Sequence, residues 1–281
     1  MNLAKKLFED TKIMKITPTE RINQPSTTEF WNEFVVPDKP VIITGVANEW
    51  KACEQWTPET FKSMFGDVIA PLRASDDEIE VFFGGLAEKK LISIADYIDS
   101  ILSATQDGEK RLYLGNIPFD SPIAKAHLDK IRPDFEFPNY FPDNTGNDLR
   151  LWIGGANQKS TIHNDNYHNL NAQIFGEKTF LLFAPEEYQK LYATKMDDEL
   201  WSSPIDPQKP NLSKYPLFDD VTGLEAVLTP GDILFIPAFW WHQARSITPA
   251  INVNMWVYTH KICEIWEQHP VLSGNMANVV S

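Results

Sequence analysis

The sequence predicts a mainly β protein with α elements, in which a mixed α/β amino-terminal part precedes a β-sandwich or jelly-roll barrel. From Leu149 onward, short β-rich runs follow one another, and glycine, proline or polar turns separate most of them. Before that point, segments with helical spacing alternate with β-branched runs. A chain of 281 residues with 43% hydrophobic content can bury one substantial core, so we expect a single domain over 1–281.

The first 148 residues alternate between helical and extended patterns. Residues 28–36 (TEFWNEFVV) carry apolar residues at helical spacing, and the KPVIITG run that follows predicts a strand closed by glycine. Residues 57–67 begin with a threonine suited to capping a helix, and residues 93–102 repeat the helical period. KRLYLGN, at 110–116, predicts a strand. We therefore expect a mixed α/β layer over 1–148.

Residues 149–260 have the sequence pattern of a β-sheet core. Evenly spaced short strands separated by turns predict a sandwich or a jelly-roll barrel. Within this core, the proline-rich segment 202–216 predicts a long loop, of the kind that often carries binding function on a β scaffold. We expect residues 261–281 to form a C-terminal helical tail. The predicted strand runs are LRLWIGG, STIHND, HNLNAQIFGEKTFLLFAP, EAVLTP, GDILFIPAF, WWHQARSI and AINVNMWVYT.

Composition narrows the classes of partner. Lysine and arginine total 25 and aspartate and glutamate total 39, so the net charge of −14 disfavours nucleic acid as a partner. The amino terminus lacks an apolar signal core, and no apolar run approaches the ~20 residues of a membrane span. Cys53 and Cys263 lie far apart in no metal-ligand or redox spacing, which fits a reducing compartment. We expect a cytoplasmic protein without a membrane partner.

The stretch STIHNDNYHNLNAQ at 160–173 places a histidine two residues before an aspartate. On a strand, residues i and i+2 project from the same face, so His163 and Asp165 can reach one metal ion. The same spacing recurs at His127 and Asp129, where the surrounding pattern AKAHLDKIRP is helical. In a helix these two side chains lie about 200° apart and cannot share a ligand. We interpret His127 and Asp129 as part of a solvated helical face.

A third metal ligand is available in GDILFIPAFWWHQARS, where His242 follows two tryptophans on a predicted strand. Two imidazoles and one carboxylate that leave other metal positions open are typical of non-haem Fe(II) oxygenases. A core histidine satisfied by hydrogen bonds is the alternative for His242 taken alone. His168 has the opposite strand parity to His163 and is expected to face away from the metal or to line the cavity mouth. His260 and His269 stand near the C terminus without candidate co-ligands in sequence.

Two blocks, IHNDNYHNLNAQIFGEKTFLLFAP and PGDILFIPAFWWHQ, resemble the Jumonji-C (JmjC), cupin-like branch of the Fe(II)- and 2-oxoglutarate-dependent dioxygenases. The resemblance extends to KPVIITGVANEW and RLYLGN, and so covers most of residues 28–258. It implies a double-stranded β-helix with a mixed α/β amino-terminal layer. It also implies that His163, Asp165 and His242 bind Fe(II), with 2-oxoglutarate and O2 as cosubstrates.

The resemblance assigns further positions to 2-oxoglutarate. The family lysine after the motif, which pairs with the distal carboxylate of 2-oxoglutarate, matches Lys178. The alternative for this residue is a solvated hairpin-turn lysine, with Arg245 as the other cation near the ligand strand. A family threonine falls on Ser160, with Thr161 one residue later, so either hydroxyl can serve. Positions similar to cosubstrate positions in the asparaginyl hydroxylase of the hypoxia response are Tyr113, Asn169 and Asn254.

The strand after the motif alternates amides with apolar residues. Three amides on one face suit a polar ligand cavity, and an ordinary strand with its polar face in solvent is the alternative. Parity with His163 favours the cavity. The amides are Asn169, Asn171 and Gln173, and the apolar residues between them are Leu170, Ala172 and Ile174.

These observations predict an Fe(II)- and 2-oxoglutarate-dependent oxygenase that hydroxylates an amino-acid side chain in a peptide or protein. Related alternatives are a JmjC-type demethylase and a hydroxylase of tRNA or a small molecule. A cupin-type metal isomerase or hydrolase and a non-catalytic binding module are alternatives from other classes. We expect the 202–216 loop to close over a bound peptide; a homodimer is compatible with the sequence. Aromatic residues that could line the peptide site, or else belong to the barrel core, are Tyr167, Trp240, Trp241 and Trp256.

Overall fold

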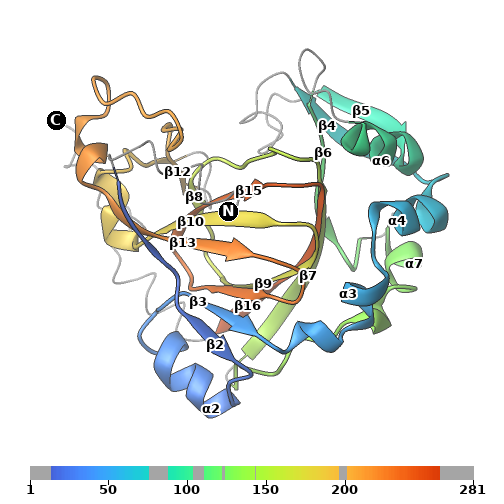
Figure 1. Ribbon diagram of the computed structural model, residues 1–281, viewed down its shortest axis with the longest axis horizontal. Coiled ribbons are helices and arrows are strands. Elements are labelled where there is room, and N and C mark those ends of the chain that lie inside the picture. The colour runs from blue at the N-terminus through green and yellow to red at the C-terminus, as the bar shows by residue number, and fades with distance from the viewer. Residues whose placement is uncertain are drawn as a thin grey trace, which may run out of the picture.

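Two β-sheets form the centre of the molecule, and helices lie beside and below them in the view of Figure 1. The predicted fold class, mainly β with α elements in a jelly-roll arrangement, is confirmed. The computed structural model describes residues 14–75, 88–103, 111–121, 124–142, 144–195 and 201–259, with the backbone alone at 71–75, 88–90, 111–113 and 144–145.

The larger sheet combines strands from both halves of the chain. Its centre is antiparallel, because β16 pairs with β7 on one side and with β9 on the other. The parallel pair β2 and β3 joins one edge through β14. Among the described residues the order is β2 (Arg21–Asn23), β3 (Val41–Thr44), β14 (Ile233–Ile236), β9 (His168–Phe175), β16 (Ala250–Thr259), β7 (Asn144–Gly154), β6 (Arg111–Pro118), β4 (Ile69–Ser75) and β5 (Glu88–Ser93).

The smaller sheet carries the strands of the histidine motif. β10 lies between β13 and β15 and is antiparallel to both, and β15 pairs in turn with β8. The amino-terminal strand β1 is parallel to β13 at the edge. In the described part of the chain the order is β1 (Lys15–Pro18), β13 (Thr222–Leu228), β10 (Lys178–Phe183), β15 (Trp241–Ser246), β8 (His163–Asn164), β12 (Trp201–Ser202) and β11 (Thr194–Lys195).

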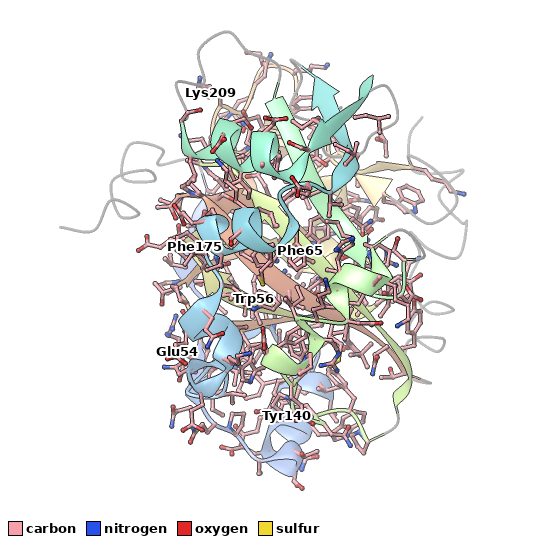
Figure 2. The ribbon with its side chains drawn as sticks, turned by 90° about the vertical axis from the view of Figure 1, so that its right-hand side faces the viewer. Glu54, Trp56, Phe65, Tyr140, Phe175 and Lys209 are labelled. Carbon is pink, nitrogen blue, oxygen red and sulfur yellow. The ribbon has the colours of Figure 1, made fainter. Side chains whose placement is uncertain are left out.

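Helices cover the outer face of the larger sheet. Side-chain hydroxyls of Ser26, Thr57 and Ser93 accept backbone N–H groups three residues later and so cap α2, α4 and α6. Figure 2 views this layer from its own side, with Trp56 and Phe65 near its middle. The helical segments are α2 (Thr27–Phe30), the π-helical η1 (Trp31–Val35), η2 (Ala47–Glu49), α3 (Lys51–Gln55), α4 (Pro58–Phe65), α6 (Ile94–Leu102), α7 (Lys125–Leu128), η3 (Arg132–Asp134), η4 (Pro185–Gln189) and η5 (Pro216–Asp220).

Strand alternation gives each sheet an inner and an outer face. Leu170 points outward from the larger sheet into the apolar cluster beneath the helices. Leu181 and Trp241 point outward from the smaller sheet into a second cluster. Leu182 and Leu234, one from each sheet, share a third cluster, so the two inner faces pack against each other and enclose the barrel interior.

Two boundaries differ from the sequence prediction. The division at residue 149 falls inside β7, which begins at Asn144 because its pairing with β16 continues to Thr259. STIHND contributes only the two-residue β8, since the strand ends at Asn164 and the chain bends at residues 166–167. The amino-terminal part is also more than a covering layer, because it supplies strands to both sheets.

The C-terminal tail predicted at 261–281 lies outside the described residues, together with His260. The same holds for Cys263 and His269, so the predictions made for them stay predictions. Within the described residues, no helix is both long enough and apolar enough to cross a membrane.

Tyr97 on α6 joins the helical layer to the larger sheet. Its buried hydroxyl donates to the carbonyl oxygen of Ile153 at 2.6 Å and accepts the backbone N–H of Leu114 at 3.3 Å. Leu114 and Ile153 are register partners at the point where the β6–β7 pairing becomes irregular. Burial raises the pKa of the Tyr97 phenol, so the hydroxyl keeps its proton at neutral pH.

We expect Tyr97→Phe to lower the free energy of unfolding by about 1–3 kcal/mol, because it leaves two buried backbone groups without their hydroxyl partner. Urea denaturation followed by circular dichroism measures the change. Tyr258→Phe is the control, since Tyr258 is 36% exposed and its loss of a hydroxyl should alter stability by less than about 0.5 kcal/mol. Equal effects of the two substitutions would contradict the bridging role.

Candidate metal centre

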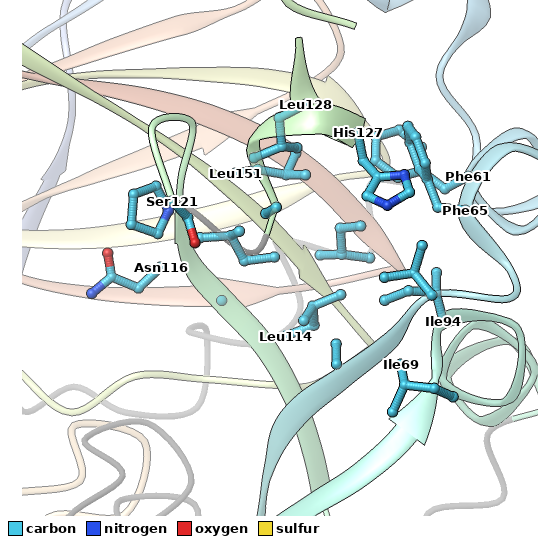
Figure 3. Close-up of a pocket in the computed structure, with 17 residues that line it drawn as sticks. Phe61, Phe65, Ile69, Ile94, Leu114, Asn116, Ser121, His127, Leu128 and Leu151 are labelled. Atoms are coloured by element: carbon cyan, nitrogen blue, oxygen red, sulfur yellow. The ribbon is translucent and has the colours of Figure 1, made fainter. Parts of the chain in front are cut away.

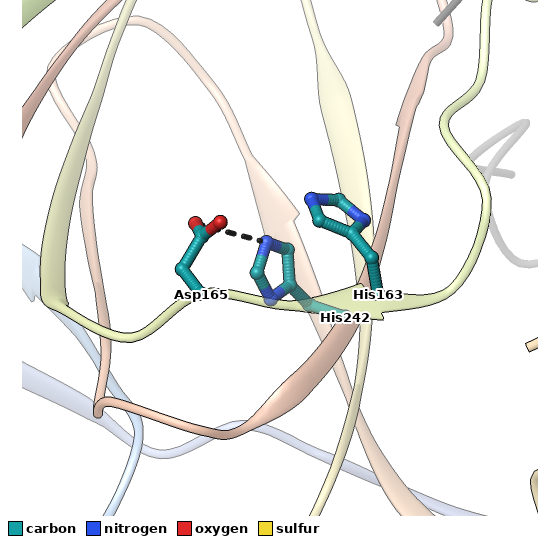
Figure 4. A group of neighbouring side chains, drawn as sticks. All are labelled: His163, Asp165 and His242. Carbon is teal, nitrogen blue, oxygen red and sulfur yellow. Dashed lines mark ion pairs between the residues drawn. The ribbon is translucent and has the colours of Figure 1, made fainter. Parts of the chain in front are cut away.

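His163 and His242 lie opposite each other on two paired strands. In the antiparallel pairing of β15 with β8, His242 is the register partner of His163. Trp241, the preceding residue, points outward, so alternation turns His242 into the barrel. The two imidazole rings are 4.4 Å apart between centroids and are inclined by 52° (Figure 4).

Asp165 completes the group from the bend after β8. Its carbonyl oxygen accepts the backbone N–H of Phe239 at 2.8 Å, which ties this bend to the segment that leads into β15. Phe239 has a φ of 67°, a left-handed conformation that is uncommon for a bulky residue. The Oδ2 atom of Asp165 lies 3.7 Å from Nε2 of His242, the pair joined by the dashed line in Figure 4. The side chain of Asp165 is 17% exposed.

Backbone carbonyls orient both imidazoles. Nδ1 of His163 lies 3.0 Å from the carbonyl oxygen of Thr161, and Nδ1 of His242 lies 3.0 Å from that of Trp240. A carbonyl can only accept, so Nδ1 carries the proton in each ring and Nε2 presents its lone pair. Burial, and next the proximity of His242, lowers the pKa of His163 to about 4, so this ring is neutral at pH 7.

The three side chains form a donor set suited to a divalent transition metal. One ligand atom from each of His163, Asp165 and His242 lies within 4.8 Å of the other two. Two neutral imidazoles and one carboxylate on one side of an ion are the ligand set of Fe(II) sites that keep other positions open. The chemistry of the donors and their burial therefore fit Fe(II).

The other histidines with a described position take no part in this group. His168 faces away as predicted, stacks on Phe141 at 5.6 Å and accepts the backbone N–H of Ala238. Asp129 is exposed and pairs with Lys125, whereas the ring of His127 packs edge-on against a phenylalanine of α4. His127 on α7 and Asp129 at its C-cap thus diverge as expected, although His127 is half-buried and not on a solvated face.

Lys178 is a buried cation on the inner face of the smaller sheet. It follows the turn at Gly176, which has a φ of 72° and where a Cβ would collide with the carbonyl oxygen of Pro249. Lys178 is 7% exposed, so the alternative of a solvated turn residue is wrong. Its Nζ donates to Oδ1 of Asn252, a neutral acceptor. Burial lowers its pKa from 10.5 to about 7.

Lys178 and the histidines face the same interior at different levels. Lys178 is in register with Ser246, and Leu182 is in register with His242. Four residues along the strand separate the two levels by roughly 13 Å, so an elongated anion suits the space better than a small ion. Arg245 alternates with His242 onto the outer face, where its Nη2 donates to an asparagine, so it is not the second cation of this interior.

Hydrogen bonds between side-chain amides join β9 and β16 on the inner face of the larger sheet. Nδ2 of Asn254 donates to Oδ1 of Asn169, and Nδ2 of Asn252 donates to Oδ1 of Asn171, each at 3.2 Å. Nε1 of Trp152 on β7 donates to Oδ1 of Asn254 at 2.6 Å. The predicted amide row therefore faces inward. Sequence reasoning missed Asn252, although its position two residues before Asn254 on one strand was the available signal.

Two adjacent hydroxyls have different surroundings. Ser160 Oγ donates to the carbonyl oxygen of Thr161 and accepts the backbone N–H of Ala244. Thr161 Oγ1 is buried and has no hydrogen-bond partner among the described residues. Thr161 is therefore the hydroxyl still available to a ligand. The side chain of Tyr113 lies outside what the structure describes, so its predicted contact with 2-oxoglutarate stays a prediction.

The four aromatic residues near the motif divide into two sets. Trp241 is fully buried in the outer cluster and cannot contact a peptide. Trp240 is half-buried and packs against the inner apolar cluster. Tyr167 lies 5.8 Å from Trp256 and 4.5 Å from Tyr258 between ring centroids. These three rings form a partly exposed aromatic cluster, here called the β16 aromatic cluster.

The 202–216 loop packs on the outer face of the smaller sheet. Ile205 is buried in the same cluster as Trp241. Gln208 donates to the side chain of Gln243, a residue that alternates outward beside His242. This anchoring lies on the face opposite the candidate metal ligands, so the closing of the loop over a bound peptide stays a prediction that the packing does not support.

A family model described as a cupin-like domain matches residues 27–262. The chain belongs to this cupin-like family. The match covers the described strands of both sheets except β1 and β2, which precede it. The cupin-like jelly roll predicted from the motifs is thereby confirmed.

Several named proteins are similar in sequence to this chain. Lysine-specific demethylase 8 of Danio rerio is 28% identical over 263 residues, which cover 90% of this chain and 62% of the relative. The human bifunctional peptidase and (3S)-lysyl hydroxylase JMJD7 is 24% identical over 262 residues, 83% of this chain and 81% of the relative. JmjC domain-containing protein D of Dictyostelium discoideum is 26% identical over 83% of this chain and 55% of its own. The cupin-like chain spans less than two thirds of the Danio rerio and Dictyostelium relatives.

We expect His163→Ala, Asp165→Ala and His242→Ala each to abolish stoichiometric Fe(II) binding, because each removes one of three ligands. Anaerobic calorimetric titration with Fe(II) measures binding, and circular dichroism checks that the variants stay folded. Asp129→Ala is the matched control, since it removes a carboxylate from the same His-x-Asp spacing on a helix. Retention of one tight Fe(II) site in all three variants would disprove the ligand assignment.

Proposed function

We propose that this protein is an Fe(II)- and 2-oxoglutarate-dependent oxygenase that hydroxylates an amino-acid side chain in a peptide or protein. The observation that carries the proposal is the pairing of two features on one interior. His163, Asp165 and His242 converge as potential metal donors. Lys178 is buried on the same interior, and burial, with no compensating carboxylate, lowers its pKa. A metal alone explains the first feature, whereas a metal together with an anionic cosubstrate explains both.

In this proposal Lys178 binds the distal carboxylate of 2-oxoglutarate. Leaving an ammonium in a dry interior is costly unless an anion meets it. The carboxylate would restore the charged form of Lys178, whose pKa burial holds at about 7. Asn252 already accepts one N–H of the ammonium, and its own amide is held by Asn171, so Lys178 is positioned before the cosubstrate arrives.

Of the two hydroxyls that the family resemblance offers to 2-oxoglutarate, those of Ser160 and Thr161, we assign the contact to Thr161. Its unpartnered Oγ1 can donate to a cosubstrate oxygen, while Ser160 is committed to the β15 backbone. Asn169 and Asn254 bind each other, and Trp152 holds Asn254 in place. We assign this amide pair to the polar floor against which the cosubstrate lies.

When bound, Fe(II) with 2-oxoglutarate and O2 supplies an oxidant that inserts one oxygen atom into a C–H bond, while the keto acid becomes succinate and CO2. The protein residues bind and orient the reactants. His163 and His242 remain neutral donors because carbonyl oxygens hold their Nδ1 protons. The apolar cluster with Leu182 and Leu234 keeps water from one side of the interior.

A peptide or protein substrate is supported by charge and by the aromatic surface. The net charge of −14 favours basic or neutral peptides over polyanions. The β16 aromatic cluster offers partly exposed rings to an extended chain. The human relative is named a lysyl hydroxylase and the Danio rerio relative a lysine-specific demethylase. We extend to this chain a protein substrate and a cytoplasmic location.

Demethylation is the second candidate, favoured by the name of the Danio rerio relative. It uses the same oxidation, because hydroxylation of an N-methyl carbon gives an unstable product that releases formaldehyde. The product mass separates the two outcomes. Hydroxylation adds 16 Da to the peptide, whereas demethylation removes 14 Da and releases formaldehyde.

We expect Lys178→Met to weaken 2-oxoglutarate binding roughly ten- to a hundredfold, the effect of losing a charge-assisted contact of about 1.5–3 kcal/mol. Fe(II) binding should not change. Lys159→Met is the matched control, since Lys159 pairs with Asp206 beside the outer face. Calorimetric titration of the Fe(II)-loaded proteins measures both constants, and equal affinities in wild type and Lys178→Met would place the carboxylate elsewhere.

The affinity for 2-oxoglutarate should fall as the pH rises above about 7, because the free protein then loses the Lys178 proton that the dianion requires. The stability of the ligand-free protein should change in the opposite direction. Between pH 7 and 10.5 the Lys178 side chain is protonated in the unfolded chain but not in the folded chain. Its contribution to the free energy of unfolding therefore increases as the pH rises. Binding constants from pH 6 to 9 test the slope, which Lys178→Met should remove.

Turnover on a peptide library should give a +16 Da product on one side chain, formed in step with succinate. Mass spectrometry of the peptides and of succinate measures the coupling, and His242→Ala serves as the inactive control. Coupled oxidation of tRNA or a free metabolite, with no oxidised peptide, would disprove the substrate assignment. Turnover without 2-oxoglutarate would instead favour a cupin-type isomerase or hydrolase.

A further inference from the structure

A second pocket lies between the helical layer and the outer face of the larger sheet. Its volume is about 250 Å³, and α4, α6 and α7 supply one side of it. Leu151 and Ile153 of β7 also line it, and Figure 3 shows Leu151 among the lining side chains. These residues alternate with Trp152, which points into the barrel, so the larger sheet separates this pocket from the candidate metal centre.

The pocket is large for a gap in a packed core. Protein interiors leave few voids larger than a water molecule, and an apolar cavity of about 150 Å³ is enough to bind benzene. A volume of about 250 Å³ therefore has room for two fused rings. Ile69, which lines one end, is 56% exposed, so the pocket can be reached from solvent.

His127 is the polar group in this apolar lining. Its ring packs edge-on against Phe65 at 5.8 Å and points toward the pocket in Figure 3. Nδ1 is buried and has no hydrogen-bond partner within the described part of the chain. A buried ring nitrogen without a partner costs free energy that a ligand can recover by forming one hydrogen bond.

Asn116 marks the other end of the pocket. Its Oδ1 is also buried without a hydrogen-bond partner among the residues described, and its φ of 57° is one that asparagine tolerates. Asn116 and Ser121 lie across the pocket from His127 in Figure 3. Among the described residues that line the pocket there is no aspartate, glutamate, lysine or arginine, so the lining does not match a charged ligand.

We propose that this pocket binds a neutral, mostly apolar small molecule about the size of two fused rings, held by a hydrogen bond to Nδ1 of His127. The apolar walls contribute affinity, and the single polar contact orients the ligand. The site is separate from the metal centre and needs neither Fe(II) nor 2-oxoglutarate. It also gives a role to His127, which the metal site leaves unused.

Binding of 2-naphthol to the 281-residue chain tests the proposal. Fluorescence titration should give saturable binding of one molecule per chain. 2-Methoxynaphthalene has the same rings without the hydroxyl donor and should bind roughly fivefold more weakly, the effect of one neutral hydrogen bond. 2-Naphthoate, which is charged at neutral pH, should bind more weakly than both. A preference for the naphthoate, or no saturable binding of 2-naphthol, would overturn the proposal.

Four substitutions locate the site. Ala124→Phe places a ring in the pocket and should abolish binding, whereas Ala126→Phe, on the exposed side of α7, should not change it. His127→Phe keeps the ring and removes the hydrogen bond, so it should bind 2-naphthol and 2-methoxynaphthalene equally. His163→Ala should bind 2-naphthol like the wild type, which excludes the metal centre as the binding site.

A crystal structure of the wild-type complex keeps the proposal testable if Ala124→Phe does not fold. The naphthol oxygen should lie within hydrogen-bond distance of Nδ1 of His127. Density for the ligand in the barrel interior, or unchanged affinity in a folded Ala124→Phe variant, would overturn the assignment.

Discussion

The short pairing between β15 and β8 is the constraint on which the candidate metal centre depends. It involves two register pairs, Trp241 with Asn164 and His242 with His163. A slip of one residue would turn His242 outward and Trp241 inward. Trp241 is fully buried in the outer cluster, and burying a large apolar side chain contributes about 1.5–3 kcal/mol. Apolar packing outside the barrel therefore holds the ligand geometry inside it.

The interior contains groups whose hydrogen-bonding or charge requirements the protein meets only in part. Lys178 contacts a neutral amide, and Thr161 Oγ1 has no hydrogen-bond partner in the described residues. Such groups destabilise a folded protein unless a ligand satisfies them. The neutral imidazole of His163 adds a lone pair from the same interior. One metal with one elongated dianion would satisfy all three kinds of group, which unites the family assignment with the physical chemistry of the site.

The fold and the convergence of His163, Asp165 and His242 could be predicted because they follow from strand alternation and local spacing. Local spacing predicted that His163 and Asp165 would meet, and they do so although β8 ends at Asn164, before Asp165. The end of β8 before Asp165, the role of Asn252 and the side of the sheet that the 202–216 loop covers depend on packing between distant segments. Local sequence patterns do not predict contacts of this kind. The pocket beside His127 escaped prediction for the same reason, since its walls come from separate helices and strands.

A crystal structure of the protein with Mn(II), as a redox-inert substitute for Fe(II), and 2-oxoglutarate tests the central claim most directly. We predict the metal in contact with His163, Asp165 and His242, and the distal carboxylate of 2-oxoglutarate within hydrogen-bond distance of Nζ of Lys178. A metal bound by other residues, or a cosubstrate whose distal carboxylate leaves Lys178 bound only to the amide of Asn252, would contradict the account.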